Sequence, residues 1–523
     1  MELAQRLVLL ALLLAVSSPC KFIQSPMDFG PLNVVPPTTT KASSDFGRLS
    51  FGTPCAVLKP NSAEDISLLL ARLSSSAAAA AFGGRVTVAA RGAGHSIHGQ
   101  AQAPDGIVVE MGSLPPSIEV HRGPLLSYAD VGGGAMWSEV LEETLRLGLA
   151  PRSWTDYLHL TVGGTLSNAG IGGQAFKHGP QISNVLQLDV VTGKGELVTC
   201  SPAETPELFY AVLGGLGQFG IITRARIALQ EAPHKVRWAR AFYDDFRTFT
   251  GDQELLISMP EMVDYVEGFV VLSEHSLHGS SNAFPAHVGF IAELRKDRSR
   301  IYYCIEFAVH DYRRRETNVE QVMEKISRKM RYMGSHMYSV EVSYFDFLNR
   351  VTMEEATLRS RGLWEVPHPW LNFFVPKSGI NEFKDLLWDY VSPEDFMGPV
   401  LIYPLLRDKW NTNTSAVFPE TGVTDRVVYV VGILRSTNPN TCSLQCLRDL
   451  LRHNRELAEA AGEPHIGAKQ YLGRHPSPGH WQDHFGSKWG RFASHKARFD
   501  PLSILGPGQG IFPRSADPTM SSV

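Results

Sequence analysis

The sequence predicts an α+β protein with two domains, and three observations support this prediction. The chain has 523 residues, more than one ordinary hydrophobic core accommodates. Residues 45–231 alternate short apolar strand patterns with helical patterns, which is typical of a mixed α/β domain. From residue 232 the strands are longer and more aromatic, and charged helical stretches separate them. This change indicates a second, α+β domain.

The individual elements follow from local patterns. Strands of the first domain are expected where Val, Ile and Leu gather close to glycines, at residues 85–90, 107–111, 125–131, 185–191 and 220–228. Helices are expected where apolar residues recur at helical spacing, at residues 66–73, 136–147 and 207–213. The second domain has predicted strands at 264–272, 301–310 and 427–434 and a predicted helix at 318–333. After residue 465 the chain is again rich in glycine and proline.

Composition and charge exclude fibrous and nucleic-acid-binding proteins. The chain is 43% hydrophobic and 20% charged, as globular proteins are. Its 49 Lys and Arg against 53 Asp and Glu give a formal net charge of −4, and no long basic run could face phosphates. We therefore expect no nucleic-acid partner.

The first residues are typical of a secretory signal peptide, which we place at residues 1–20. Arg6 precedes an apolar run at 7–16, and small and polar residues follow. The run is shorter than the ~20 apolar residues of a membrane helix, and no later stretch is that long without interruption. We expect a secreted protein in the apoplast, without a membrane anchor. Endomembrane compartments or the vacuole are the alternative locations.

The cysteines suggest neither a disulfide framework nor a metal site. Cys20 falls in or beside the signal, and the remaining five are an odd and sparse set without zinc spacing. Cys442 and Cys446 are four residues apart on a predicted helix, where we expect packing rather than a disulfide. Asn413 begins an Asn-Thr-Ser acceptor for N-glycosylation.

Three glycine-rich segments in the first domain indicate a large ligand. The strand at 85–90 runs into residues 91–99, whose backbone N–H groups can face an anion. Ile97 replaces the third glycine of a dinucleotide-binding fingerprint and no helix pattern follows, so nicotinamide binding is not predicted. Glycines recur at 161–173 and 213–220. Because glycine is costly to order, something flat or another backbone should lie against these segments, and an extended dinucleotide would fit.

These segments resemble the FAD-binding domain of the vanillyl-alcohol-oxidase class. The resemblance rests on Arg91-Gly92-Ala93-Gly94-His95-Ser96, Thr161-Val162-Gly163-Gly164 and the glycines from Gly214. It implies that FAD is bonded covalently to His95, which could otherwise be a hydrogen-bonded core histidine. Some members of the class add a cysteine link, but no cysteine lies between Cys55 and Cys200. A single link is therefore expected, which would retain the cofactor and raise its potential.

The resemblance also implies a fold. A two-domain vanillyl-alcohol-oxidase-type fold would place an FAD-binding α/β domain at 45–231 and 469–517, split in sequence by a substrate domain at 232–468 with an antiparallel sheet and flanking helices. Gly506 stands where the class commonly has serine. The residues that match FAD-contact positions are Ala90, Gly92, Gly94, His95, Ser96, Gln100, Asp156, Thr161, Ser167, Ile171, Ile222, Tyr471, Gly506 and Gln509.

Within the class, motifs from about residue 45 to 513 are similar to those of cytokinin dehydrogenases. They include Trp154-Thr155-Asp156-Tyr157-Leu158, Tyr265-Val266-Glu267-Gly268, Val366-Pro367-His368-Pro369-Trp370-Leu371-Asn372, Gly398-Pro399 and Lys469-Gln470-Tyr471-Leu472-Gly473-Arg474-His475. The resemblance implies cytokinin catabolism by an FAD-dependent oxidoreductase. The N6 side-chain amine would lose a hydride to flavin, and water would split the imine into adenine or adenosine and an unsaturated aldehyde.

Two carboxylates are the implied catalytic residues. Asp156 would take the proton of the substrate amine, if hydrogen bonds keep its pKa low enough. The alternative is that Asp156 caps a helix or a turn. Glu267 would receive the N–H edge of the purine and reject substrates that lack that donor. It lies in an otherwise apolar strand, so its alternative is a carboxylate that faces solvent.

Six further residues are expected in the substrate pocket, although each could instead belong to the core or to a solvated helix face. They are Val351, Glu354, Trp370, Asn372, Pro399 and Leu472. The expected partners are small-molecule cytokinins and a quinone-type electron acceptor or O2, and the resemblance suggests a monomer. Two other functions stay open at this point, namely an alcohol or carbohydrate oxidase of the same fold and a hormone-binding protein whose flavin site has decayed.

Overall fold

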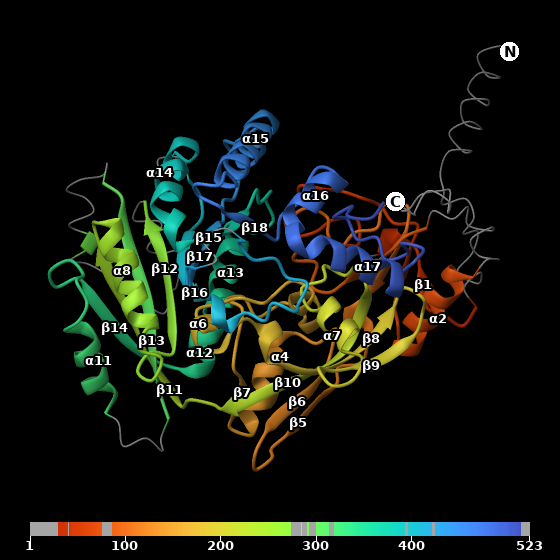
Figure 1. Ribbon diagram of the computed structural model, residues 1–523, viewed down its shortest axis with the longest axis horizontal. Helices are drawn as coiled ribbons and strands as arrows, with labels where there is room; N and C mark the ends of the chain where they lie inside the picture. The colour runs from red at the N-terminus through yellow and green to blue at the C-terminus, as the bar shows by residue number, and fades with distance from the viewer. Residues whose placement is uncertain are drawn as a thin grey trace.

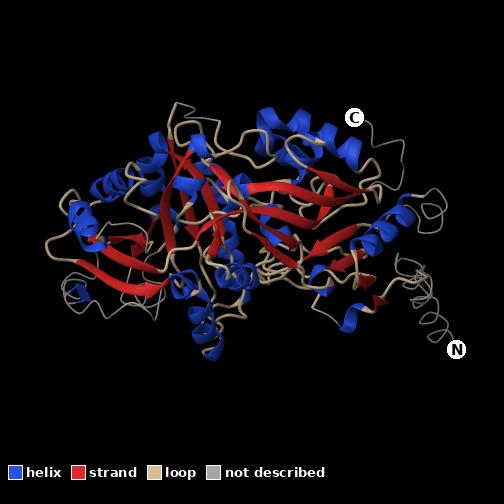
Figure 2. Ribbon diagram, turned by 90° about the horizontal axis from the view of Figure 1, so that it is seen from below, coloured by secondary structure: helices blue, strands red, loops and turns tan. Residues whose placement is uncertain are grey.

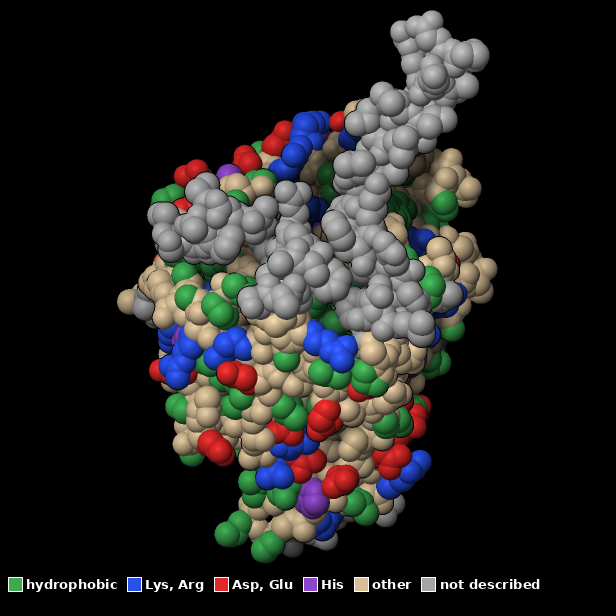
Figure 3. Space-filling view, turned by 90° about the vertical axis from the view of Figure 1, so that its right-hand side faces the viewer, with side chains coloured by type: hydrophobic (Ala, Val, Ile, Leu, Met, Phe, Trp, Pro, Cys, Tyr) green, Lys and Arg blue, Asp and Glu red, His purple; other side chains and the backbone are tan. Residues whose placement is uncertain are grey.

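The computed structural model describes residues 30–39, 41–75, 86–272, 284, 290–291, 300–312, 318–392, 396–420 and 424–513. The predicted signal peptide at 1–20 lies outside these residues. Among the helices in the described ranges, none is both long and apolar enough to span a bilayer. On the face in Figure 3, acidic and basic side chains are interspersed.

The first domain begins with a small mixed sheet of order β1-β2-β4-β3. Its strands are β1 (Val34–Val35), β2 (Ala56–Leu58), β4 (Ile107–Glu110) and β3 (Val88–Arg91), of which β2 and β3 run parallel to β4. Helix α2 (Ala63–Ser74) covers this sheet because its buried Ile66, Leu69, Leu70 and Leu73 recur at helical spacing. The predicted strand and helix patterns are confirmed here.

A second, antiparallel sheet completes the first domain. Its order is β5-β6-β10-β8-β9, and β7 pairs with β10. The predicted strand at 125–131 starts two residues late because Leu125 and Leu126 are exposed in the turn before β6. The bounds are β5 (Ile118–His121), β6 (Ser127–Gly132), β7 (Leu149–Pro151), β8 (Val185–Thr192), β9 (Leu197–Cys200), β10 (Gly220–Glu231), α4 (Trp137–Arg146), α5 (Val162–Leu166), α6 (Ala175–His178) and α7 (Pro206–Val212).

An eight-stranded antiparallel sheet forms the second domain (Figure 1). Its order is β14 (Met337–Ser343), β11 (Lys235–Tyr243), β13 (Tyr302–Asp311), β12 (Tyr265–Val271), β16 (Val400–Leu406), β17 (Val427–Ile433), β15 (Leu371–Pro376) and β18 (Lys469–Tyr471). One face packs against α8 (Phe246–Ile257), α11 (Val319–Ser327), α14 (Ile380–Tyr390) and α15 (Leu444–Ala461). Figure 2 shows strands through the middle of the molecule and helices along its upper and lower edges.

Strand alternation decides which side chains of this sheet reach the first domain. Val266 and Val270 of β12 point to the helical layer, whereas Tyr265 packs into the core that the two domains share. Glu267 is two residues from Tyr265 and therefore lies on the same face. The short helices α12 (Tyr344–Leu348) and α13 (Arg350–Ser360) close this side.

The C-terminal segment links both domains. β18 still pairs with β15 in the large sheet, and the chain then returns to the first domain through α16 (Pro478–Phe485) and α17 (Trp489–Phe499) (Figure 1). Buried Lys496 of α17 donates to the carbonyl oxygens of Gln218 and Leu505 at 3.0 and 2.8 Å. Leu505 bridges to Val88 at the edge of β3. These bonds fix residues 503–510 against the third glycine-rich segment.

Two local predictions are wrong. The helix expected at 318–333 ends at Ser327, because residues 328–333 turn back towards β11, where the Met333 N–H donates to Phe242. Cys442 and Cys446 form a disulfide, with a Cα–Cα distance of 5.3 Å. Ser443 caps α15, so Cys442 precedes the helix and can approach Cys446 in the first turn. Asn413 is exposed in a turn, and its glycosylation remains a prediction.

Candidate active site

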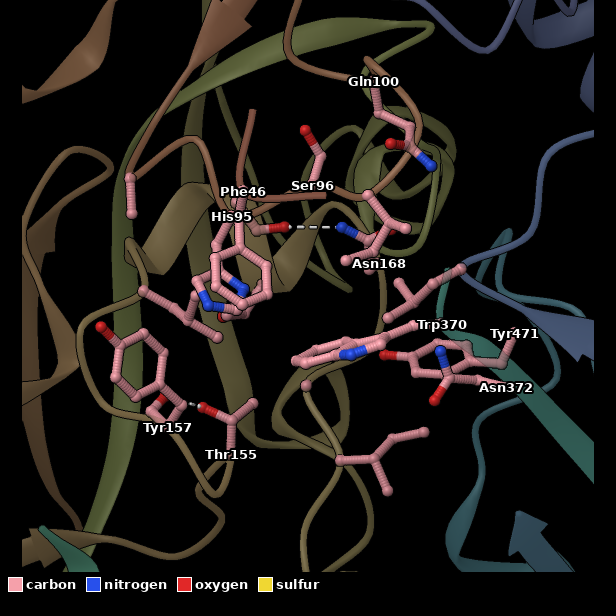
Figure 4. A pocket seen from close by; sticks show the side chains of 18 of the residues that line it. Phe46, His95, Ser96, Gln100, Thr155, Tyr157, Asn168, Trp370, Asn372 and Tyr471 are labelled. Atoms are coloured by element: carbon pink, nitrogen blue, oxygen red, sulfur yellow. Dashed lines mark hydrogen bonds between the residues drawn. The ribbon is translucent and has the colours of Figure 1, made fainter. Parts of the chain in front are cut away.

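A cavity of about 750 Å³ lies between the two domains (Figure 4). All three glycine-rich segments of the first domain line it, as do strands of the large sheet and α13. The predicted site residues that line it are Ala90, Gly92, Gly94, His95, Ser96, Gln100, Asp156, Thr161, Ser167, Ile171, Ile222, Glu267, Val351, Glu354, Trp370, Asn372, Pro399, Tyr471, Leu472 and Gln509. Motifs far apart in sequence therefore meet at one site.

Gly506 is the exception among the predicted cofactor residues, since it is not part of the cavity wall. Its N–H donates to the carbonyl oxygen of Val88 at 3.2 Å, and a Cβ at this position would lie 2.9 Å from Thr87 Cγ2. Its neighbours Leu505 and Pro507 line the cavity instead. In this structure Gly506 fastens the C-terminal segment to β3, and a contact with FAD remains a prediction.

Backbone forms much of the flavin side of the cavity. A Cβ on Gly92 would lie 1.9 Å from Thr161 Oγ1, and one on Gly133 would lie 2.0 Å from the carbonyl oxygen of Ile222. Gly94 has a φ of 67°, which glycine adopts readily. Only glycine lets these segments pack so closely beside the cavity. A cradle of this kind fits a large flat cofactor with a pyrophosphate.

His95 is a neutral imidazole at the cavity wall. Its Nε2 is buried and has no hydrogen-bond partner among the described residues, unlike that of a satisfied core histidine. Burial, with a smaller contribution from nearby His368, lowers the pKa of His95 to about 3. Figure 4 shows the ring of Phe46 against that of His95, with Tyr157 beside them. An unprotonated ring nitrogen can act as a nucleophile towards a bound group.

Asp156 lies at the corner after β7, where the first domain meets the large sheet. Its Oδ1 accepts from the Tyr265 hydroxyl at 3.3 Å and from Arg350 Nη2 at 3.4 Å. Both partners belong to the second domain. These side-chain contacts differ from those of a turn-capping aspartate, and the carboxylate remains partly open to the cavity, with 28% of its side chain exposed.

Glu267 faces the cavity and is buried, so the solvent-facing alternative is wrong. Burial raises the pKa of Glu267 well above its usual value, the Asp156 carboxylate raises it further, and Arg350 partly opposes both effects. Arg350 Nη2 lies 3.6 Å from Glu267 Oε2. Burial and the neighbouring Asp156 therefore favour the protonated form of Glu267.

Sequence reasoning missed Arg350 and Tyr265. Arg350 opens α13, is buried, and donates to the Tyr265 hydroxyl and to the carbonyl oxygen of Phe347, the latter at 3.0 Å. Tyr265 precedes Glu267 by two residues, and this spacing could have placed it on the same strand face. No local signal in the sequence distinguishes Arg350 from Arg359, the other arginine of its helix.

A buried ion pair between Arg240 and Glu306 lies beside Glu267. Glu306 of β13 stands opposite both Glu267 of β12 and Arg240 of β11, and Arg240 Nε donates to Glu306 at 2.6 Å. Glu306 also lines the cavity, as does Glu354 of α13. Burial raises the pKa of Glu354 to about 7, with a further contribution from Glu306. Several carboxyl groups, and the arginines whose positive charges offset theirs, therefore lie close together in the cavity wall.

Apolar and amide groups form another part of the cavity wall. Asn372 of β15 pairs with Tyr471 of β18, and Trp370 lies beside them in Figure 4. Leu472 follows with a φ of 57°, a strained conformation for leucine that leaves it 38% exposed. A flat heteroaromatic ring would fit between such groups.

Two family models match the chain. One is described as "FAD binding domain" and matches residues 54–201, and the other as "Cytokinin dehydrogenase 1, FAD and cytokinin binding" and matches residues 233–512. The second spans more than half of the chain. The FAD-binding assignment of the first domain is thereby confirmed.

Curated relatives and solved structures agree with these matches. The chain is 68% identical to cytokinin dehydrogenase 3 of Oryza sativa subsp. japonica over 98% of this chain and 96% of that protein. It is 45% identical to cytokinin dehydrogenase 1 of Arabidopsis thaliana, over 90% of this chain and 81% of that protein. A 6-hydroxy-D-nicotine oxidase of Arthrobacter nicotinovorans covers 92% of this chain with a TM-score of 0.64 and 18% identity, and 98% of that protein is matched. A VAO-type flavoprotein of Myceliophthora thermophila covers 88% of this chain, with 80% of that protein matched, a TM-score of 0.63 and 15% identity. The fold is of the vanillyl-alcohol-oxidase type, and the chain belongs to the cytokinin dehydrogenase family of FAD-dependent oxidoreductases.

Proposed function

We propose that this protein degrades cytokinins by oxidising the amine of their N6 side chain. The observation that supports this most directly is a single cavity that joins the glycine-lined flavin side to the buried pair Asp156 and Glu267. Bound FAD supplies the hydride acceptor for the α-carbon of the amine. Water then splits the imine product into adenine or adenosine and an unsaturated aldehyde.

Asp156 is the proton acceptor in this proposal. It faces the cavity, and the cation of Arg350 and the hydroxyl of Tyr265 stabilise negative charge on its Oδ1. The raised pKa of Glu267 favours its protonated form, so the two neighbouring carboxyl groups need not both carry a charge. An ionised carboxylate within hydrogen-bond reach of the amine would take its proton as hydride leaves.

Glu267 has a recognition role in this proposal. Its Oε1 is buried without a hydrogen-bond partner in the described part of the chain. A buried oxygen of this kind costs free energy until a donor reaches it, and the N–H edge of a purine would supply that donor. Trp370, Asn372 and Leu472 also line the cavity and would contact the ring. Substrates without the N–H edge would leave the oxygen unpaired.

We further propose that FAD is attached to a ring nitrogen of His95. The neutral imidazole and its unpartnered Nε2 support this proposal. Replacement of His95 by Ala should leave all flavin extractable with acid, whereas wild-type flavin should stay with the precipitated protein. Flavin that is extractable from the wild type would refute the attachment.

The remaining proposals concern partners and location. A quinone-type acceptor or O2 would reoxidise the flavin, and the protein would act as a monomer in the apoplast. Endomembrane compartments or the vacuole are the alternative locations. Amino-terminal sequencing of the mature protein and glycosidase treatment for Asn413 would test the secretory route.

The decisive experiment is anaerobic addition of isopentenyladenine to the purified protein. Rapid bleaching of the flavin absorbance with release of adenine would establish the substrate class and the reaction together. A yellow protein that stays yellow would contradict the proposal and point to alcohols or sugars as substrates. A colourless protein would favour a hormone-binding function.

A further inference from the structure

A short segment near the N-terminus, Asp45-Phe46-Gly47, lies between the His95 segment and the second domain. The Phe46 N–H donates to the carbonyl oxygen of Gly94 at 2.8 Å, and the Gly47 N–H donates to that of Ser96 at 3.0 Å. These two bonds flank His95 on both sides. A Cβ on Gly47 would lie 2.0 Å from the carbonyl oxygen of Ile97, so only glycine permits this approach.

The aromatic ring of Phe46 is stacked between two imidazoles. Its centroid lies 3.9 Å from that of His95, with an interplanar angle of 12°, and 4.1 Å from that of His368, with an angle of 8°. Nearly parallel rings at these distances leave little freedom for the His95 ring to turn. Phe46 itself is only half-buried, because it also borders the cavity.

His368 is itself fixed by the second domain. Its Nε2 lies 2.9 Å from the carbonyl oxygen of Trp364, and its Nδ1 lies 2.9 Å from Ser436 Oγ. This pattern sets a neutral tautomer with the proton on Nε2. The His368 N–H also donates to the carbonyl oxygen of Gly47 at 2.9 Å. The second domain therefore fixes the His368 ring, which stacks on Phe46, and Phe46 in turn stacks on His95.

Asp45 fixes the other end of the glycine-rich segment. Its Oδ2 accepts from Ser96 Oγ at 3.0 Å and from the Gly99 N–H at 2.5 Å. The carboxylate is buried, and these bonds hold the chain immediately after His95. Together with the backbone bonds of Phe46 and Gly47, they leave the His95 ring one well-defined position at the cavity wall.

We propose that Asp45-Phe46-Gly47 is a positioning clip that sets the His95 ring for attachment of FAD, and that the ring stack with His368 makes attachment depend on docking of the second domain. This rests on the proposed link to His95. In the attachment step, a ring nitrogen of His95 bonds to the methyl carbon at position 8 of the flavin. The imidazole ring and the methyl carbon would each lose one hydrogen, and the corresponding two electrons and two protons would pass to the flavin. O2 or a quinone then reoxidises it.

Phe46 and His368 exchange no atoms in this step, and both are positioning residues. Their contribution is to reduce the orientations of the imidazole, and misplacement of a nucleophile by about 1 Å can cost about 100-fold in rate. A purely structural role for Phe46 predicts a different pattern, in which stability falls while the fraction of covalent flavin is unchanged.

The test compares Phe46→Ala, Phe46→Leu and Phe46→Tyr in the full chain, with Phe51→Ala as the control. Phe51 follows the clip by four residues but is 71% exposed. Flavin fluorescence of acid-precipitated protein gives the covalent fraction, and absorbance of the native protein gives the total. We expect Phe46→Ala to retain FAD but to lose about ten-fold in covalent fraction over a fixed incubation. Phe46→Leu should be intermediate, while Phe46→Tyr and Phe51→Ala should match the wild type.

His368→Asn extends the test to the other domain. It removes the second imidazole without altering the clip, and we expect its covalent fraction to fall as well. Covalent fractions at the wild-type level in Phe46→Ala and Phe46→Leu would overturn the clip, and the same result in His368→Asn would overturn the dependence on domain docking. If Phe46→Ala does not fold, the volume-conserving Phe46→Leu decides. Acid-extractable flavin in the wild type would instead refute the link to His95, and the clip with it.

Discussion

The two sides of the cavity are built in different ways. On the flavin side, glycine backbone packs so closely that Gly92 has no room for a methyl group beside Thr161. On the substrate side, the wall consists of long charged side chains on regular strands and on α13, such as Glu267 and Arg350. The flavin side thus depends on backbone shape, whereas the substrate side depends on charge balance.

This difference predicts different failures. A methyl group added to the flavin side should displace the cofactor while the carboxyl groups remain in place. A charge removed on the substrate side should leave the cofactor bound but alter proton transfer. The two sides can therefore be separated by measuring flavin content and reductive rate in the same variants.

The largest effect is expected on the substrate side. Asp156→Asn removes the proton acceptor but keeps its shape, so the rate of anaerobic flavin reduction should fall by about 100- to 10,000-fold. Stopped-flow reduction by isopentenyladenine measures this rate. Flavin content and substrate affinity should stay within a few-fold of the wild type. A normal rate of reduction would remove Asp156 from the mechanism.

On the flavin side, Gly92→Ala should lose most of its bound FAD. Its Cβ would overlap Thr161, which is buried and β-branched and therefore cannot move aside easily. Absorbance of the purified protein at the flavin bands measures the loss. Gly112→Ala is the matched control, because its Cβ would meet no atom within 4 Å. Equal flavin content in both variants would contradict the backbone cradle.

The same difference explains what the sequence can and cannot predict. His95 and the glycine-rich segments are runs of consecutive residues, so a local pattern is enough to identify them. The carboxylates Asp156 and Glu267 are identifiable because each lies in a recognisable motif. Their environment is not predictable, since Arg350 is 194 residues from Asp156 in sequence and reaches it only through the fold.

Fold prediction has the same limit. Strand patterns such as 220–228 predict their elements, because burial on a sheet face leaves a local signature. The disulfide between Cys442 and Cys446 escapes prediction because it depends on where α15 begins, and helix ends are set by capping rather than by periodicity. No sequence pattern identifies Phe46 either, because its role depends on stacking between two imidazoles more than 250 residues apart in sequence.

A smaller effect should follow from the cation between the two carboxyl groups. Arg350→Met keeps the length of the side chain but removes its charge, so negative charge on the neighbouring carboxyl groups is less stabilised. In the pH profile of the rate of flavin reduction, the fall on the acid side should then move to higher pH by about one to two units. Rates measured from about pH 5 to 9 would show this shift. Arg350→Lys, which keeps the charge, should shift this fall less, and equal shifts in both variants would refute the electrostatic role.

The smallest expected effect concerns stability. The pKa of Glu354 is about 7 in the folded protein, above the usual 4.5, because the carboxyl group is desolvated. Between these two values the folded state holds a proton that the unfolded state has lost, so stability falls as pH rises and the penalty is complete above about pH 7. Glu354→Gln avoids this penalty. Its Tm should exceed that of the wild type by about 2 °C at about pH 8 but match it at about pH 4.5. Glu119→Gln, at a position 72% exposed, should show no such difference. An equal gain for Glu354→Gln at both pH values would indicate better packing instead of a relieved charge, and the substrate side would then be less dependent on charge balance than its geometry indicates.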